Sequence, residues 1–198
     1  MTPSRKDRSR AAILDASEAA FAELGFDNVS MDGIARRAGL TRMTVYNLFA
    51  AKDDIAIAIG DRAAAKADPW LRPRMEAGES AADLLRDALM GSAEWCLANP
   101  TIAAINLRGR KLTSLEPPAG APSFHGITRD IFALGQRQGL FRSDEDPNDM
   151  ALVLLGGFAQ LILFALAGTP FDPARVELLL RLNTEGFGAR SINPKGQK

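Results

Sequence analysis

The segment from Gly33 to Lys52 carries four basic side chains and no acidic one. The cations are Arg36, Arg37, Arg42 and Lys52. Side chains of this kind neutralise phosphates and release counterions, which supplies most of the non-specific affinity of proteins for DNA. A guanidinium can also pair with O6 and N7 of guanine in the major groove. The pattern therefore predicts binding chemistry directed at double-stranded DNA.

The charge of the whole chain hides this basic segment. The 198 residues hold 24 Lys or Arg and 24 Asp or Glu, so the formal net charge is zero. Residues 1–52 contain eight basic and six acidic side chains, and the remaining residues contain sixteen and eighteen. We interpret the zero as a cancellation between a basic N-terminal part and a slightly acidic body, which leaves the DNA-facing part positive.

Residue types for catalysis or metal binding are sparse. Cys96 and His125 are the single cysteine and histidine, and no third residue is placed to orient them as a dyad. The sequence has no Gly-rich phosphate loop, no HExxH motif and no Cys/His metal spacing. We expect no enzyme activity, no metal and no cofactor. One cysteine and an N-terminus without an apolar signal segment favour the cytoplasm.

The elements that must position the basic segment are predicted to be helices. Apolar residues recur at helical spacing, and capping residues precede Pro100, Pro147 and Pro173. We expect an all-α fold of about nine helices. Loops are expected near 68–79, 111–122 and 140–146, with a loose tail after Arg190.

Two short helices are predicted around Gly39. Ser30 is placed to cap the first helix and Thr41 the second. Val45 and Phe49, four residues apart, are expected to be buried, as are Phe21 and Leu24 in a long preceding helix. Two short helices joined by a turn that contains glycine form the helix-turn-helix pattern.

This region resembles the DNA-binding domain of the TetR family of bacterial transcriptional regulators. Three blocks carry the resemblance: F-A-E-L-G-F at 21–26, I-A-R-R-A-G-L-T at 34–41, and T-V-Y-N-L-F-A-A-K-D-D-I at 44–55. It covers about residues 10–56. The resemblance implies a domain at 1–56 with a three-helix helix-turn-helix, a helical ligand-binding and dimerisation domain at 57–190, and a tail at 191–198.

The resemblance also implies roles for individual side chains. Thr41 and Tyr46 would contact phosphates, and Lys52 would hold the DNA backbone. Arg36, in the basic cluster, is a further candidate for DNA contact. The side chains expected to face base edges are Arg42, Met43, Thr44 and Asn47.

A long apolar stretch runs from Met150 to Ala167 without a charge. Its length would just span a bilayer core, which leaves a membrane-associated helical protein as an alternative. The resemblance favours a homodimer in which the last two helices of each subunit form a four-helix bundle. The dimer candidates are Leu152, Gly156, Ala159, Leu163, Val176, Leu179, Leu180 and Asn183. Gly157 would also permit close approach of helices.

In the TetR family the middle helices usually enclose a small-molecule pocket. Candidates to line it are Met90, Trp95, Cys96, Leu107, Arg108, Phe124, His125, Phe132, Phe158 and Leu161. Further candidates are Phe164, Arg110 and Gln160. The expected function is a ligand-responsive regulator, a repressor that binds a near-palindromic operator as a dimer and is released by an unidentified small-molecule effector. The alternative is a ligand-independent regulator whose body serves dimerisation or partner contact alone.

Overall fold

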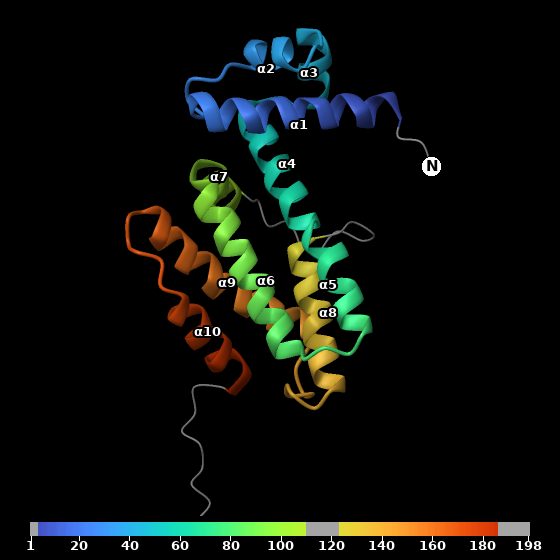
Figure 1. Cartoon of the computed structure of the whole chain (residues 1–198), viewed down its shortest axis with the longest axis vertical. Coiled ribbons are helices and arrows are strands. Elements are labelled where there is room, and N and C mark those ends of the chain that lie inside the picture. The colour runs from blue at the N-terminus through green and yellow to red at the C-terminus, as the bar shows by residue number, and fades with distance from the viewer. Residues whose placement is uncertain (1–3, 110–122, 186–198) are drawn as a thin grey trace, which may run out of the picture.

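The computed structural model describes residues 4–109 and 123–185. Every regular element within these residues is an α-helix (Figure 1). The ten helices are α1 (Arg5–Leu24), α2 (Met31–Arg37), α3 (Arg42–Leu48), α4 (Lys52–Ala65), α5 (Ala67–Glu76), α6 (Ala81–Ala98), α7 (Pro100–Gly109), α8 (Phe124–Arg137), α9 (Pro147–Leu166) and α10 (Pro173–Glu185). The predicted all-α class is confirmed. The helix count is one above the expected nine because α5 lies where a loop was predicted.

The loop predicted near 68–79 is wrong, because α5 occupies most of it. Pro69 stands in the first turn of α5, where a helix needs no N–H donor, whereas Pro73 lies inside the helix. Leu71 is fully buried. Arg72 binds Asp68 in the same helix and Asp130 on α8, at 2.5 and 2.8 Å. Tertiary contacts thus stabilise a helix that local propensity disfavours.

The other predicted loops have different outcomes. The connection at 140–146 lies between α8 and α9, as expected. Asp146 caps α9 by accepting from the backbone N–H of Asn148, and Asp172 accepts from Ala174 at the start of α10. The predicted loop at 111–122 and the tail after Arg190 lie outside the described residues.

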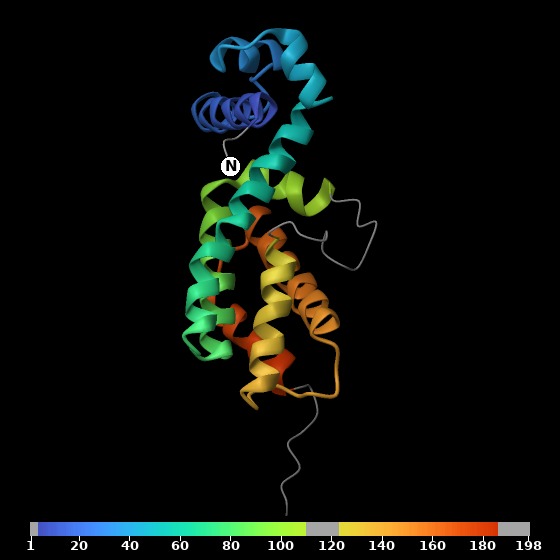
Figure 2. The ribbon, with the colours of Figure 1, turned by 90° about the vertical axis from the view of Figure 1, so that its right-hand side faces the viewer.

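The first three helices form a separate layer at one end of the molecule (Figures 1 and 2). Helix α4 leads from this layer into the remaining helices, which form the body. Ser30 and Thr41 cap α2 and α3 through their side chains, as predicted. Gly39, in the turn between these two helices, has a φ of +67°, a left-handed conformation that favours glycine.

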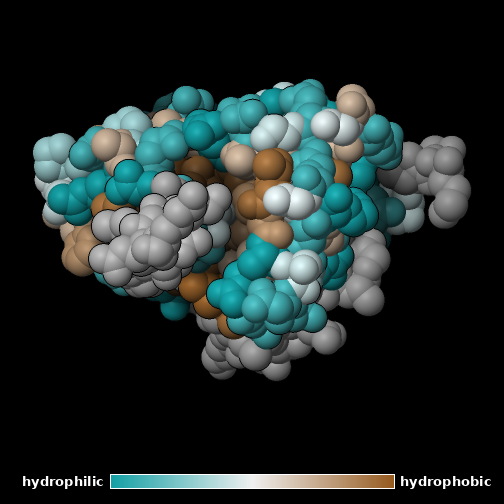
Figure 3. Space-filling model, turned by 90° about the horizontal axis from the view of Figure 1, so that it is seen from below, coloured by the Kyte–Doolittle hydropathy of each residue, from teal (hydrophilic) through white to brown (hydrophobic). Residues whose placement is uncertain are grey.

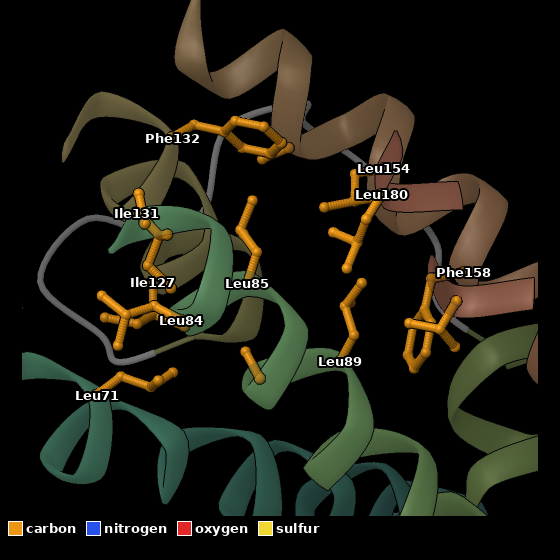
Figure 4. Close-up of a cluster of buried hydrophobic side chains, with 14 of the residues drawn as sticks. Leu71, Leu84, Leu85, Leu89, Ile127, Ile131, Phe132, Leu154, Phe158 and Leu180 are labelled. Carbon is orange, nitrogen blue, oxygen red and sulfur yellow. The ribbon is translucent and has the colours of Figure 1, made fainter. Parts of the chain in front are cut away.

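Two buried clusters hold the chain together. The N-terminal cluster contains Ile13, Phe21, Val45 and Phe49 and extends to Ile59 on α4. Leu24, in contrast, is 49% exposed, so its predicted burial is wrong. The body cluster joins side chains from helices α5, α6, α8, α9 and α10 (Figure 4). Its labelled members are Leu71, Leu84, Leu85, Leu89, Ile127, Ile131, Phe132, Leu154, Phe158 and Leu180.

The two clusters meet around α6 and α7. Trp95 on α6 packs against both clusters, and Ile102 on α7 is a buried member of the N-terminal one. The layer of α1–α3 therefore rests on the body through apolar contacts as well as through α4.

The end of the body that lies opposite α1–α3 is mostly hydrophilic, with hydrophobic residues showing in a hollow between hydrophilic surfaces (Figure 3).

Candidate nucleic-acid interface and internal pocket

Helix α3 presents a row of exposed side chains because its apolar side is used in the N-terminal cluster. Val45 is fully buried, whereas Met43 is 70% exposed and Tyr46 is 42% exposed. Arg42 and Asn47 are also exposed, and Thr44 is half-buried. The predicted base-facing residues thus lie on the outer side of the second helix of a helix-turn-helix. This is the element that enters the major groove in such motifs.

Arg42 is held in place by two contacts. Its Nε lies 3.0 Å from Oδ1 of Asp32 on α2, and its Cζ lies 5.3 Å from the centroid of the Tyr46 ring. Sequence reasoning missed the ion pair with Asp32, because the pair depends on how α2 and α3 pack against each other. The pair joins the two helices of the motif and orders a long side chain at the surface.

The remaining basic candidates differ in their contacts. The Nζ of Lys52 donates to the carbonyl oxygens of Phe26 and Asp27, at 2.7 and 3.4 Å. An ammonium has three donors, so one is left for a phosphate. Arg37 forms an ion pair with Glu23 on α1. Arg36 is exposed and Thr41 uses its hydroxyl to cap α3, so their contacts with DNA stay predictions.

A pocket of about 380 Å³ lies between the middle helices. Aromatic walls come from Trp70, Trp95 and Phe124, and polar groups from Lys66, Ser92 and Asn106. Space is created by small residues: Gly60, Ala63, Ala64, Ala67, Gly91 and Ala103. A mostly apolar cavity with few polar groups is typical of small-molecule sites, and its volume is near the lower end of the usual range of about 300–1,000 Å³.

The structure brings four of the predicted pocket residues to this cavity: Trp95, Cys96, Leu107 and Phe124. The predictions for Phe132 and Phe158 are wrong, because both are buried in the body cluster. Leu161 lines a small hollow between α9 and α10 instead. Helical spacing identifies buried positions, but it does not say which neighbour a side chain faces.

The other predicted pocket residues lie elsewhere. Met90 packs against the body cluster, and Arg108 is exposed on α7. His125 neighbours a lining residue, but does not line the cavity itself. Gln160 and Phe164 are exposed on α9. Arg110 lies outside the described residues. The missed lining residues are mostly Gly and Ala, which leave no distinctive pattern in a helical sequence.

The single cysteine is part of the pocket wall but is not poised to react. Burial raises the pKa of the Cys96 thiol to about 11, although a hydrogen bond from Ser92 opposes part of this effect. The thiol therefore stays protonated at neutral pH, and a thiolate is the form that reacts. Cys96 is 8% exposed and contributes apolar surface to the cavity.

Two helical glycines line the pocket for different reasons. A Cβ on Gly60 would lie 2.3 Å from the side-chain amide of Asn106 on α7, whereas a Cβ on Gly91 would meet nothing within 4 Å. The Asn106 amide donates to the carbonyls of Ala56 and Ile102, at 3.0 and 2.9 Å. Gly60 thus permits a hydrogen-bonded contact between α4 and α7 through Asn106, and Gly91 leaves room in the cavity.

The same substitution is expected to have opposite effects at these glycines. Gly91→Ala should stabilise the protein by about 0.5–1 kcal/mol through helix propensity. Gly60→Ala gains that propensity but displaces Asn106 and its two hydrogen bonds, each contributing about 0.5–1.5 kcal/mol, so a net loss of about 1 kcal/mol is expected. Denaturant unfolding of both variants measures the difference. Equal denaturation midpoints for the two variants would contradict a stabilising role of the Asn106 contact between α4 and α7.

Helix α9 has an uncovered apolar face. Among the described residues it is the one helix long and apolar enough to span a membrane, and 22% of its most apolar window is buried. The exposed residues recur at helical spacing: Val153, Gly156, Gln160 and Phe164. Exposed large apolar side chains such as Val153 and Phe164 on one helix face are typical of an interaction site.

The predicted dimer residues divide into three groups. Val176 and Leu180 are buried within the same chain, so their prediction as contact residues is wrong. Leu152, Ala159, Leu163, Leu179 and Asn183 are half-buried. Gly157 permits close packing within the chain, because a Cβ there would lie 2.7 Å from Cδ1 of Leu179. Exposed Gly156 has open space around it.

Comparison with known proteins agrees with this geometry. The family model described as bacterial regulatory proteins, tetR family, matches residues 13–59. These residues contain the helix-turn-helix and the capping residues described above. Residues 13–59 thus carry the DNA-binding region that is characteristic of the tetR family of bacterial regulatory proteins. No curated protein sequence matches the chain.

Solved structures show the same fold over nearly the whole chain. FadR from Thermus thermophilus, a TetR-family transcriptional repressor in complex with lauroyl-CoA, is 22% identical with a TM-score of 0.74, covering 95% of this chain and 100% of that one. FadR from Bacillus subtilis, in complex with stearoyl-CoA, is 17% identical with a TM-score of 0.64, covering 90% and 99%. RolR in complex with resorcinol is 19% identical with a TM-score of 0.64, covering 90% and 88%.

Proposed function

We propose that this protein is a cytoplasmic, dimeric repressor that leaves its operator when a small molecule occupies the pocket. The observation that carries the proposal is the course of α4. Its first half belongs to the N-terminal cluster, and its second half lines the pocket with Gly60, Ala63 and Ala64. One rigid element thus connects the two sites that the function requires.

Contacts between α4 and the DNA-binding layer support this coupling. Arg62, beside the lining residue Ala63, binds Asp15 and Glu18 on α1, each at 2.6 Å. At the other end, Lys52 binds the connection between α1 and α2. A shift of α4 caused by a ligand would move α1 and the helix-turn-helix with it. The coupling free energy needed is modest, typically about 1–3 kcal/mol.

The proposed DNA contacts are those of the exposed side of α3. Arg42 would pair with a guanine, and Met43 would pack against a thymine methyl group. Thr44 and Asn47 would face the bases, with Tyr46 and Thr41 on phosphates. Arg36 and the free donor of Lys52 would add phosphate contacts. Exposure of the large apolar Met43 side chain, which has no partner cluster within the described part of the chain, supports this assignment.

The proposed dimer uses the uncovered face of α9 together with α10. A symmetric dimer would place two recognition helices about 34–36 Å apart, as successive major grooves require. Burial of this face in a dimer would also explain why α9 is so apolar, with no need for insertion into a membrane. We keep the division into a DNA-binding domain at 1–56, a body at 57–190 and a tail at 191–198 as a proposal, with α4 crossing the first boundary.

A pocket supports the ligand-responsive form over a body that serves dimerisation alone. Among the solved structures with this fold, FadR is in complex with acyl-CoA molecules and RolR is in complex with resorcinol. Their ligands differ in size and chemistry, so the fold by itself does not define an effector. The effector class must come from the residues of this pocket.

The test of the proposed function is a mobility shift with DNA from upstream of the gene for this protein. We expect a specific complex whose affinity falls steeply with salt, because log K decreases by about 0.9 per neutralised phosphate for each tenfold rise in salt. A shuffled duplex of equal length is the control. Equal binding to both duplexes would overturn the proposal.

A further inference from the structure

We infer that the effector is an amphipathic anion with an apolar chain of medium length, held with its chain in the pocket and its negative charge beside Lys66. This inference rests on the proposed ligand-responsive function and specifies the chemistry of its pocket. Among the described residues that line the cavity, Lys66 is the one charged group. No carboxylate accompanies it in the described lining, so the cavity favours a negative ligand group.

The lining holds two other polar side chains, Ser92 and Asn106. Asn106 donates both amide protons to backbone carbonyls. A ligand with many polar groups along its length would find few partners for them in the cavity, which costs free energy. The lining thus suits a ligand that is apolar throughout and charged at one end.

The lining accepts an apolar group of limited size. Small residues on α4, α6 and α7 leave space beside the two tryptophan side chains. A volume of about 380 Å³ is small for a ligand pocket, so a chain of medium length fits better than a long one. Lys66 is exposed at the junction of α4 and α5, where the ligand charge would act directly on the end of α4.

Tryptophan fluorescence reports on this cavity. The chain has two tryptophans, and both Trp70 and Trp95 line the pocket. Titration with decanoate below its micelle concentration should give a saturable change. The matched ligands are decanol, which is neutral, and decyltrimethylammonium, which is positive. We expect the order decanoate, decanol, decyltrimethylammonium from tightest to weakest. Equal or tighter binding of the cation would overturn the inference.

Two variants and a control make the test specific. Lys66→Glu should weaken decanoate at least tenfold and strengthen decyltrimethylammonium, because the sign of the charge at the pocket is reversed. A merely structural role for Lys66 would weaken both. Lys6→Glu, an exposed lysine on α1, should change neither. Gly91→Leu directs a larger side chain into the cavity from a position where a Cβ meets nothing within 4 Å, and it should abolish binding of all three ligands. Unchanged decanoate affinity in Lys66→Glu would refute the anionic assignment.

The source of the anion is distinguished by a further titration with decanoyl-CoA. Tighter binding of decanoyl-CoA than of decanoate, abolished in Gly91→Leu and weakened in Lys66→Glu, would identify a thioester source. The reverse order would identify the free acid. The same variants are tested for operator binding without ligand. If operator binding is retained but no preference for anions is found, this inference is refuted and the proposed function is not. If anions bind but the operator does not, the proposed function is refuted and the anionic preference of the pocket is not.

Discussion

Arg42→Ala combined with Tyr46→Ala is expected to remove specific operator binding at protein concentrations that saturate the wild type. A good base contact contributes about 1–3 kcal/mol of discrimination, and a symmetric dimer forfeits it in both half-sites. We therefore expect affinity to fall at least a hundredfold in a mobility shift. The slope of log K against log salt should also become shallower by about one for each phosphate that the variant no longer neutralises.

The fold should survive this double substitution. Both side chains are exposed, with 68% for the Arg42 side chain and 42% for Tyr46. Exposed substitutions usually change stability by less than about 0.5 kcal/mol, which circular dichroism during heating would confirm. Arg137→Ala, at an exposed position near the end of α8, is the matched control. A specific band of wild-type strength from the double variant would refute the assignment of α3 to the operator.

Val153→Glu combined with Phe164→Glu is expected to convert the protein into a monomer. The two side chains are 64% and 49% exposed in the single chain, so the charges cost little in the isolated protomer. In a two-fold interface each charge occurs twice and is removed from water without a partner, which costs several kcal/mol. We expect the dimer dissociation constant to rise at least a thousandfold, or about 4 kcal/mol.

Sedimentation at micromolar concentration measures this change directly. Leu140→Glu, at another exposed apolar residue but between α8 and α9, should leave the dimer intact. The monomeric variant should also lose most operator affinity, since one helix-turn-helix contacts one half-site. A wild-type protein that sediments as a soluble monomer at micromolar concentration would contradict the proposed dimer.

The N-terminal part of the fold could be predicted because its signals are local. Ser30, Gly39 and Thr41 determine where two short helices begin and end, and each acts through its own side chain or backbone. Burial of Val45 and Phe49 follows from their spacing. Such signals operate within a few residues, so a single sequence contains all that they need.

The body was harder to predict because its features depend on distant neighbours. Helix α5 contains two prolines and is stabilised by contacts of Leu71 and Arg72 with other helices. Phe132 and Phe158 were predicted to line the pocket, but the structure assigns them to the core, and much of the cavity is lined by glycine and alanine. Likewise, Val176 and Leu180 face their own chain, whereas Val153 and Phe164 remain uncovered.

The position of Trp95 makes the two halves of the molecule interdependent. Its indole packs against both buried clusters, and Ile59 and Ile102 complete the N-terminal cluster from α4 and α7. A fragment beginning at residue 57 would leave these three apolar side chains without their cover. The DNA-binding layer and the body should therefore melt together, in a single cooperative transition. An effector that strengthens packing around Trp95 would then raise the melting temperature of the DNA-binding helices that it never touches.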